Sequence, residues 1–132
     1  MAARTKARKR ALDILYASEL RRESPVEALD RAIAEGEGPT NDYTAVLVRG
    51  VHEHASEIDE LISSYAQGWT LARMPAVDRN VLRIGTWEVL HADDVPGAVA
   101  VSEAMVLVRD LSTDDSPAFV NGVLGAIVRD RG

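Results

Sequence analysis

Apolar residues recur along this 132-residue chain at steps of three and four positions, the spacing that places side chains on one face of an α-helix. The first such segment covers residues 4–22. Its apolar set is Ala7, Ala11, Ile14, Leu15 and Leu20. A longer segment starts at Thr40 or Asn41 and keeps one apolar face as far as Tyr65, which predicts a single helix of about six turns. No segment alternates with a period of two between turn residues, so strands are not expected.

Turn and capping residues divide this pattern into separate helices. Ser24-Pro25-Val26-Glu27 has the sequence of a capping box with proline at the first helical position. Glycine and proline mark the other breaks: Gly36, Gly38 and Pro39, then Gly68-Trp69-Thr70, Pro75, and the loop from His91 through Gly97. The predicted fold class is all-α, a compact single domain over residues 1–132 with six or seven helices in a bundle.

The last segment, residues 112–128, predicts a capped helix with an unusual interior. Ser116 is placed to be the N-cap and Pro117 to be the first helical residue, behind two aspartates that face the positive end of the helix dipole. The apolar stripe that follows is Phe119, Val120, Val123, Leu124, Ile127 and Val128. Gly122 and Gly125 interrupt it, and each glycine costs about 1 kcal/mol relative to alanine. We therefore expect a neighbouring helix to approach closely at one of them.

Composition narrows the class of protein. The hydrophobic content of 46% without low-complexity tracts predicts a folded chain. The absence of cysteine excludes disulfides, thiolate metal sites and cysteine nucleophiles. No apolar run is long enough to cross a bilayer or to serve as a signal peptide, so we expect a cytoplasmic protein.

The net charge of −6 conceals a basic N-terminal arm over residues 1–10. The arm holds five cations and no acid, whereas the rest of the chain holds 10 basic and 21 acidic residues. The cations are Arg4, Lys6, Arg8, Lys9 and Arg10. Because the helical pattern runs through the arm, its side chains should be ordered before a ligand binds, which favours recognition. Contact with nucleic acid and a merely solvated terminus are the two interpretations that charge alone leaves.

Other polar residues have structural interpretations. His54 falls on the apolar face of the 41–65 segment, so a buried, hydrogen-bonded histidine is expected there, and His52 points elsewhere and cannot share a metal ion with it. A polar seam on the helix after Pro75 is either a solvated face or a partner surface. Its members are Asp78, Arg79, Arg83 and Glu88. No phosphate-binding glycine loop or nucleophile elbow occurs, and we expect no catalysis, cofactor or metal.

Four segments together resemble the NusB family of transcription antitermination factors. They are ARKRALDILYASEL, WTLARMPAVDRNVLRIGTWEVLH, DVPGAVAVSEAMVLVRDLS and STDDSPAFVNGVLGAI. The resemblance covers nearly the whole chain and is weakest between Ser24 and Asn41. It implies an all-helical fold, binding to the boxA element of ribosomal RNA leader transcripts, and pairing with the ribosomal protein NusE. It also implies assembly on RNA polymerase complexes that resist termination.

The resemblance further implies roles for individual residues. The arginine-rich start of the family corresponds to Arg4, Lys6, Arg8, Lys9 and Arg10, which would hold RNA phosphates. Asp115 and Phe119 match positions at the RNA surface, where the aromatic ring suits stacking on an unpaired base and the carboxylate can accept hydrogen bonds from base amines. Asp78 matches an acidic position at the NusE contact, and Arg83 an arginine that either packs or contacts the partner.

Two further interpretations accompany the RNA-binding one. The first treats the chain as a helical protein-interaction scaffold without sequence-specific RNA binding. An apolar face reserved for a partner would also serve a homodimer. A similar helical domain precedes the catalytic part of some ribosomal RNA cytosine methyltransferases. This chain has no cysteine for attack on a base, so methyl transfer is not expected.

Overall fold

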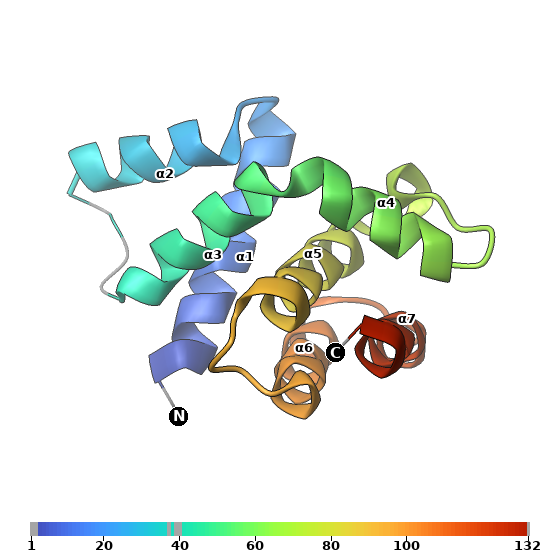
Figure 1. Ribbon diagram of the computed structural model, residues 1–132. Helices are drawn as coiled ribbons and strands as arrows, with labels where there is room; N and C mark the ends of the chain where they lie inside the picture. The colour runs from blue at the N-terminus through green and yellow to red at the C-terminus, as the bar shows by residue number, and fades with distance from the viewer. Residues whose placement is uncertain (1–2, 37, 39–40, 132) are drawn as a thin grey trace. The chain divides into compact units, whose positions relative to one another are not determined.

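The structure is a computed structural model that describes residues 3–36, 38 and 41–131. In these residues it contains seven α-helices, one short 3-10 helix and no strand (Figure 1), so the expected all-α class is confirmed. The chain divides into two compact units, residues 1–53 and 54–132. No helix in the described ranges combines the length and the apolar character needed to cross a membrane. The expected loop residue Pro39, the candidate helix start Thr40 and the first two residues of the basic arm lie outside the described residues.

The first unit consists of α1 (Ala3–Arg21), α2 (Pro25–Ala34) and α3 (Asp42–Glu53), which pack against one another. Its buried apolar side chains follow the helical spacing read from the sequence. They include Ala7, Ala11, Leu12, Leu15, Leu29, Leu47, Val48 and Val51. The Thr44 hydroxyl on α3 donates a hydrogen bond of 3.0 Å to the Ala7 carbonyl on α1. Leu20, expected in the apolar set, is instead 69% exposed in the last turn of α1.

Polar contacts close the turn between α1 and α2. Ser24 is the N-cap of α2, with its side chain accepting the Val26 N–H at 3.2 Å and proline next in the chain, as the capping sequence predicted. Arg31 donates two hydrogen bonds to the Glu23 carboxylate. These hydrogen bonds hold the pKa of Glu23 below its usual value.

The segment from 41 to Tyr65 is two helices, which corrects the single helix expected from periodicity. α3 ends at Glu53 and α4 (Ala55–Tyr65) begins after His54, whose φ of −106° and ψ of 21° depart from the helical range. Buried apolar residues resume at once with Ile58 and Ile62, and no glycine or proline marks the break, so periodicity could not locate it. His54 is half-exposed at this corner, not buried as expected.

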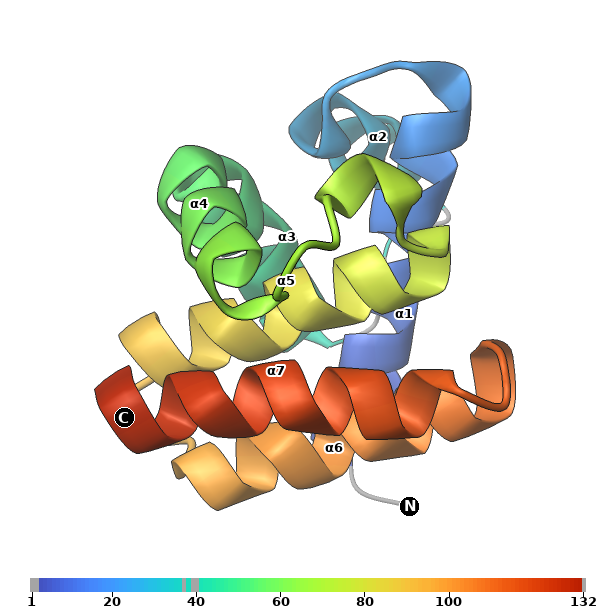
Figure 2. The ribbon, with the colours of Figure 1, turned by 90° about the vertical axis from the view of Figure 1, so that its right-hand side faces the viewer.

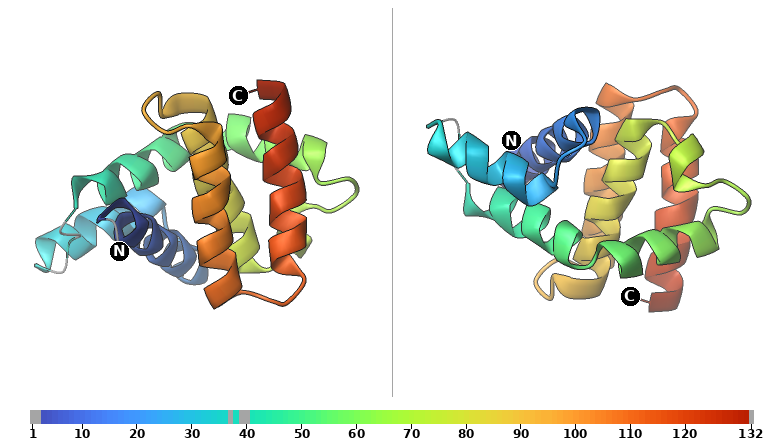
Figure 3. Two further views of the ribbon diagram at one scale, coloured as in Figure 1. Left: turned by 90° about the horizontal axis from the view of Figure 1, so that it is seen from below. Right: turned by 90° about the horizontal axis from the view of Figure 1, so that it is seen from above.

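The second unit contains α4, the 3-10 helix η1 (Leu71–Arg73), α5 (Ala76–His91), α6 (Gly97–Leu111) and α7 (Ser116–Arg131). α5, α6 and α7 run side by side and pack on one another (Figures 2 and 3), and α4 packs on α5 and α7. The fully buried side chains of this unit include Ile58, Ile62, Leu82, Ile84, Val108, Leu124 and Ile127. The α7 stripe therefore enters the interior at Val120, Val123, Leu124 and Ile127, as its spacing predicted.

Close helix packing occurs at other glycines than the two expected. A Cβ atom built on Gly122 or Gly125 of α7 would meet nothing within 4 Å, so neither glycine is required by a neighbouring helix. On α5, a Cβ atom built on Gly85 would lie 2.6 Å from Leu124 Cδ2. On α6, a Cβ atom built on Gly97 would lie 2.7 Å from Val128 Cγ1. The glycines that allow α7 to approach closely thus lie on α5 and α6, because the bulky side chains in these contacts belong to α7.

A partly buried chain of hydroxyl groups holds the start of α7. Ser116 is the first residue of the helix, one position later than the N-cap it was expected to be, and the Asp115 carbonyl accepts the Phe119 N–H at 3.3 Å. The Ser116 hydroxyl donates to the Ser112 hydroxyl at 3.0 Å, which donates in turn to the Asp78 carboxylate at 2.5 Å. The end of α6 and the start of α7 are therefore tied to the first turn of α5.

Candidate nucleic-acid interface

The cations of the basic arm lie on the first turns of α1, within the first unit, and their exposure differs. Arg4, Lys6 and Lys9 are exposed and Arg10 is half-buried. Arg8 is only 3% exposed. The cationic surface that an approaching anion meets is consequently formed by four of the five predicted residues.

Tyr43 of α3 orders part of this surface. The Arg4 guanidinium carbon lies 4.1 Å from the centre of the Tyr43 ring, and the Arg8 carbon lies 5.6 Å from it. A guanidinium within about 6 Å of an aromatic face is attracted by the ring quadrupole. Tyr43 therefore helps to hold Arg4 in place on the surface of α1 while Arg8 packs beneath.

Asp115 and Phe119 lie in the second unit, on the wall of a pocket of about 310 Å³. The pocket is lined by Trp69, Met74, Pro75, Asp78, Thr113, Asp115, Ser116 and Phe119. Asp115 is exposed and Phe119 is half-buried, so part of the aromatic ring remains accessible from the pocket. Three of the predicted residues, Asp78, Asp115 and Phe119, are thus brought together at one place.

Trp69 is a member of this site that the sequence reasoning missed. It follows Gln67 and Gly68, both of which have positive φ, and it was interpreted only as part of a turn. Its side chain is 54% exposed, and its ring meets Phe119 edge-on with 6.2 Å between ring centres. A large aromatic residue beside a turn glycine was the available signal, because turns lie at the surface and tryptophan is enriched where a surface makes contacts.

Trp69 and Phe119 also border a second hollow, between the end of α4 and the exposed face of α7. Gly122 lines it, and the missing side chain keeps that part of the surface open. The two aromatic residues therefore line both concave surfaces.

The polar seam of α5 is not a fully solvated face, because Asp78 and Glu88 are buried and Arg79 and Arg83 are half-buried, and a partner surface there stays a prediction. Asp78 is 2% exposed and accepts the Ser112 hydrogen bond. Arg79 donates to the backbone carbonyls of Leu71 and Met74, at 2.8 and 3.1 Å. These polar groups find partners inside the unit because α5 is surrounded by three packed helices, where an unpaired polar group is costly.

Arg83 has a structural partner within the second unit. Its guanidinium donates two hydrogen bonds to the Asp59 carboxylate on α4, at 2.9 and 3.1 Å, and a third to Asn80 at 3.1 Å. Such a bidentate pair between arginine and a carboxylate is stronger than a pair with a single hydrogen bond. Packing of α4 on α5 is therefore one role that the structure gives Arg83, and contact with a partner protein stays a prediction for it and for Asp78.

The two groups of residues offer different chemistry. Exposed ammonium and guanidinium groups on α1 can bind phosphates and release counterions, with little preference for sequence. The pocket is lined by aromatic rings and carboxylates, which repel phosphates but can stack on unpaired bases and accept hydrogen bonds from their amines. Each surface, taken by itself, therefore suits a different part of a nucleic acid: α1 suits the phosphates, and the pocket suits unpaired bases.

Comparison with known proteins gives a consistent result. The model of the NusB family matches residues 5–129. A transcription antitermination protein NusB from Nocardioides sp. is 75% identical over 131 residues, which are 99% of this chain and 97% of that protein.

Solved structures agree with this match. NusB of T. maritima aligns with a TM-score of 0.88 and 34% identity, over 98% of this chain and 93% of that one. A structure of antitermination factors NusB and NusE in complex with double-stranded RNA contains a chain that aligns with a TM-score of 0.82 and 30% identity, over 96% of each chain.

Proposed function

The chain belongs to the NusB family, and we propose that it is an RNA-binding transcription antitermination factor that acts with the ribosomal protein NusE on boxA-type RNA of ribosomal RNA transcripts. The observation that carries this proposal is the 75% identity, over nearly the whole chain, to a transcription antitermination protein NusB. The solved relative in complex with NusE and RNA supports the same two classes of partner.

In this proposal α1 supplies most of the affinity. Arg4, Lys6, Lys9 and the half-buried Arg10 bind RNA phosphates, and the buried Arg8 packs with Arg4 against Tyr43. Counterion release makes this contribution strongly dependent on salt and nearly independent of sequence. Sequence preference must therefore come from another surface.

We assign that preference to the pocket at the start of α7. Phe119, with Trp69 beside it, stacks on an unpaired base, and the Asp115 carboxylate accepts a hydrogen bond from a base amine. The partly buried hydroxyl chain from Ser116 to Asp78 holds the start of α7 in place, and with it Asp115 and Phe119. This order lowers the entropy lost on binding.

For the contact with NusE we propose Asp78 and Arg83. Asp78 lines the pocket but is only 2% exposed, so it would act mainly by holding Ser112 and, through it, Ser116 of the pocket wall. Arg83 would act through the position of α4, which it holds by its pair with Asp59. The assembled protein–RNA complex would then join RNA polymerase to resist termination.

The proposal covers the chain as a whole. We infer that residues 1–132 act as one RNA-binding domain, because the family model spans both compact units. We also infer a cytoplasmic, non-enzymatic role, since transcripts and ribosomal proteins are the partners proposed. A scaffold without RNA binding is the competing function, and it requires that NusE bind while RNA of any sequence does not.

Sedimentation velocity with fluorescently labelled RNA tests the proposal. The chain and NusE together should shift a boxA RNA to a faster-sedimenting species than either protein alone produces. A scrambled single strand and a duplex of the same length are the comparison RNAs, the duplex because a solved relative holds double-stranded RNA. A boxA RNA that sediments as free RNA in all mixtures would contradict the proposal.

Replacing Phe119 with leucine should weaken binding of boxA RNA about fivefold, because leucine keeps apolar bulk but loses the stacking face, whose contribution is about 1 kcal/mol or more per base. Fluorescence anisotropy measures the change in Kd. Leu20→Ala, which removes an exposed apolar side chain from the end of α1, is the matched control and should leave the Kd unchanged. Equal losses in both variants would remove Phe119 from the RNA surface.

A further inference from the structure

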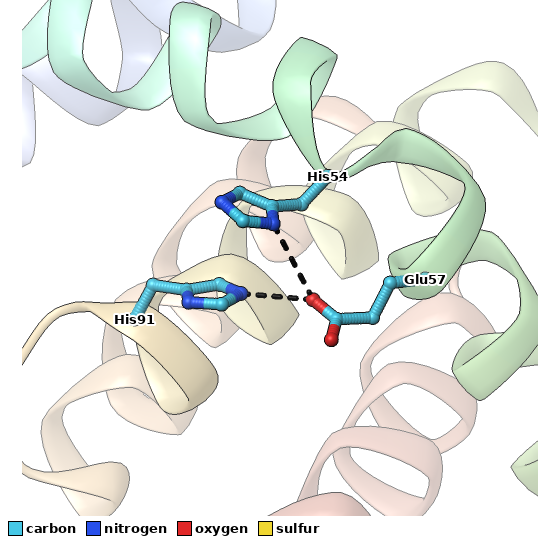
Figure 4. A group of neighbouring side chains, drawn as sticks. All are labelled: His54, Glu57 and His91. Carbon is cyan, nitrogen blue, oxygen red and sulfur yellow. Dashed lines mark hydrogen bonds and ion pairs between the residues drawn. The ribbon is translucent and has the colours of Figure 1, made fainter.

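Two histidines and a glutamate, outside the surfaces described above, converge at the start of α4 and the end of α5. They are His54, Glu57 and His91. His54 precedes α4, Glu57 lies in its first turn, and His91 is the last residue of α5. Figure 4 shows both imidazoles turned toward one carboxylate, each from a different helix end. One ligand atom from each side chain lies within 4.8 Å of the other two.

Hydrogen bonding within the trio is incomplete. His91 Nε2 lies 2.9 Å from Glu57 Oε1, which is a hydrogen-bond distance. His54 Nδ1 lies 3.6 Å from the same oxygen, which is too long for one. The two imidazole rings also stack, with 4.0 Å between centres and 22° between planes. One oxygen atom therefore faces two ring nitrogens and satisfies only one of them.

We propose that these three residues form a binding site for a divalent cation of the zinc class. Zn²⁺ bonds histidine nitrogen and carboxylate oxygen at about 2.0–2.2 Å, which places neighbouring ligand atoms about 3.4 Å apart in a tetrahedron. From the observed separations this requires a movement of about 1 Å, which the half-exposed histidines and the exposed glutamate can make by side-chain rotation. The cation would replace the single hydrogen bond with three bonds.

The ligand set selects the class of metal. Imidazole nitrogen suits Zn²⁺, Ni²⁺ and Cu²⁺, whereas Mg²⁺ and Ca²⁺ prefer shells made of oxygen. Three protein ligands leave a fourth position for water on the solvent side. The two helix ends at the site act in opposite directions, because the C-terminus of α5 attracts positive charge and the N-terminus of α4 repels it, so the ligand set decides the affinity.

The consequence for the protein is a link between two helices of the second unit. The bound cation would fasten the start of α4 to the end of α5, and it would add to the Arg83–Asp59 pair, which joins the same two helices through neighbouring residues. The sequence concealed this site because His54 was compared with its neighbour His52, while the actual companion, His91, comes much later in the chain.

Isothermal titration of tag-free, metal-stripped protein with ZnCl₂ tests the proposal. It should show one Zn²⁺ bound per chain, and His91→Gln, His54→Gln and Glu57→Gln should each weaken binding about tenfold or more. With free Zn²⁺ at about 100 times its Kd, the Tm should rise by about 5–10 °C and fall back when a chelator is added. Circular dichroism establishes that each variant is folded, and if one is not, the other two decide.

Matched controls separate this site from adventitious binding. His52→Ala and Glu60→Gln change exposed residues next to the trio and should leave the Zn²⁺ affinity unchanged. A second readout uses Trp87, whose ring lies 6.2 Å from that of His91. In a Trp69→Phe background Trp87 is the sole tryptophan, and Ni²⁺ should quench its fluorescence. Absence of saturable Zn²⁺ binding, or equal weakening by His52→Ala and His91→Gln, would overturn the proposal.

Discussion

Replacing Lys6 and Lys9 together with alanine is expected to weaken RNA binding about 25-fold at about 0.1 M salt. Each phosphate contact with a single strand contributes about 0.7 to the slope of log K against log salt, so losing two lowers the slope by about 1.4. Both side chains are exposed on α1, and alanine is the best helix former, so the variant should fold normally. Anisotropy titrations over a range of salt concentrations measure the slope.

The control for this variant removes the same charge elsewhere. Arg21→Ala with Arg109→Ala deletes two exposed cations, at the end of α1 and at the end of α6. It should leave the salt slope nearly unchanged, because local contacts and not net charge set the number of counterions released. Equal reductions in the two double variants would show that the start of α1 is not the phosphate-binding surface.

Replacing Gly85 with leucine is expected to lower the free energy of unfolding by about 3 kcal/mol. Even the first carbon of a side chain would lie 2.6 Å from Leu124 Cδ2 and 3.2 Å from Cδ1, and Leu124 is fully buried on α7. The gain in helix propensity, about 0.8 kcal/mol, offsets only part of the cost of overpacking. Equilibrium denaturation in urea measures the difference.

Gly122→Leu is the matched substitution on α7. Because nothing lies within 4 Å of the position of its Cβ, it should leave stability unchanged or raise it by up to about 1 kcal/mol. A loss as large as that of Gly85→Leu would contradict the packing described for α5, α6 and α7. Gly85→Ala, with the smallest side chain, gives a milder test should the leucine variant fail to fold.

The helices could be predicted because each buries a stripe of apolar residues, and such stripes are visible in the order of residues. Ser24 and Pro25 located the start of α2 for a local reason, since the cap contacts a backbone N–H two residues away. The break at His54 escaped prediction because a one-residue departure from helical geometry leaves the apolar spacing almost unchanged. A local pattern therefore predicts local structure, and fails where the backbone bends without glycine or proline.

Contacts between distant residues were the second source of error. The glycines of α7 stand out in the sequence, but no neighbouring atom lies close to them. The close approach between helices is instead at Gly85, which faces Leu124. Asp78 was interpreted from its place on one helix and from the family resemblance, and neither showed that it would pair with Ser112 at the end of another helix. The packing of helices decides such contacts, and spacing along one helix carries no information about it.

The candidate site was predictable to a similar degree. The cations of the arm lie close together in the chain and were found from charge alone, although the burial of Arg8 was not. Asp115 and Phe119 came from resemblance to a family and stay predictions as RNA contacts. Trp69 and the trio of His54, Glu57 and His91 required the fold, because their members meet only through helix packing and turn geometry.

The central claim is that this chain recognises boxA RNA by sequence when NusE is present. The most direct test is the ratio of Kd for a scrambled RNA to Kd for boxA RNA, measured by anisotropy with NusE at a fixed salt concentration of about 0.1 M. Hydrogen bonds to base edges predict a ratio of at least about 5, because one good base contact contributes about 1–3 kcal/mol of discrimination, whereas stacking accepts every base. A ratio of one would contradict the claim, because it would show that the chain binds RNA through phosphates without recognising its sequence.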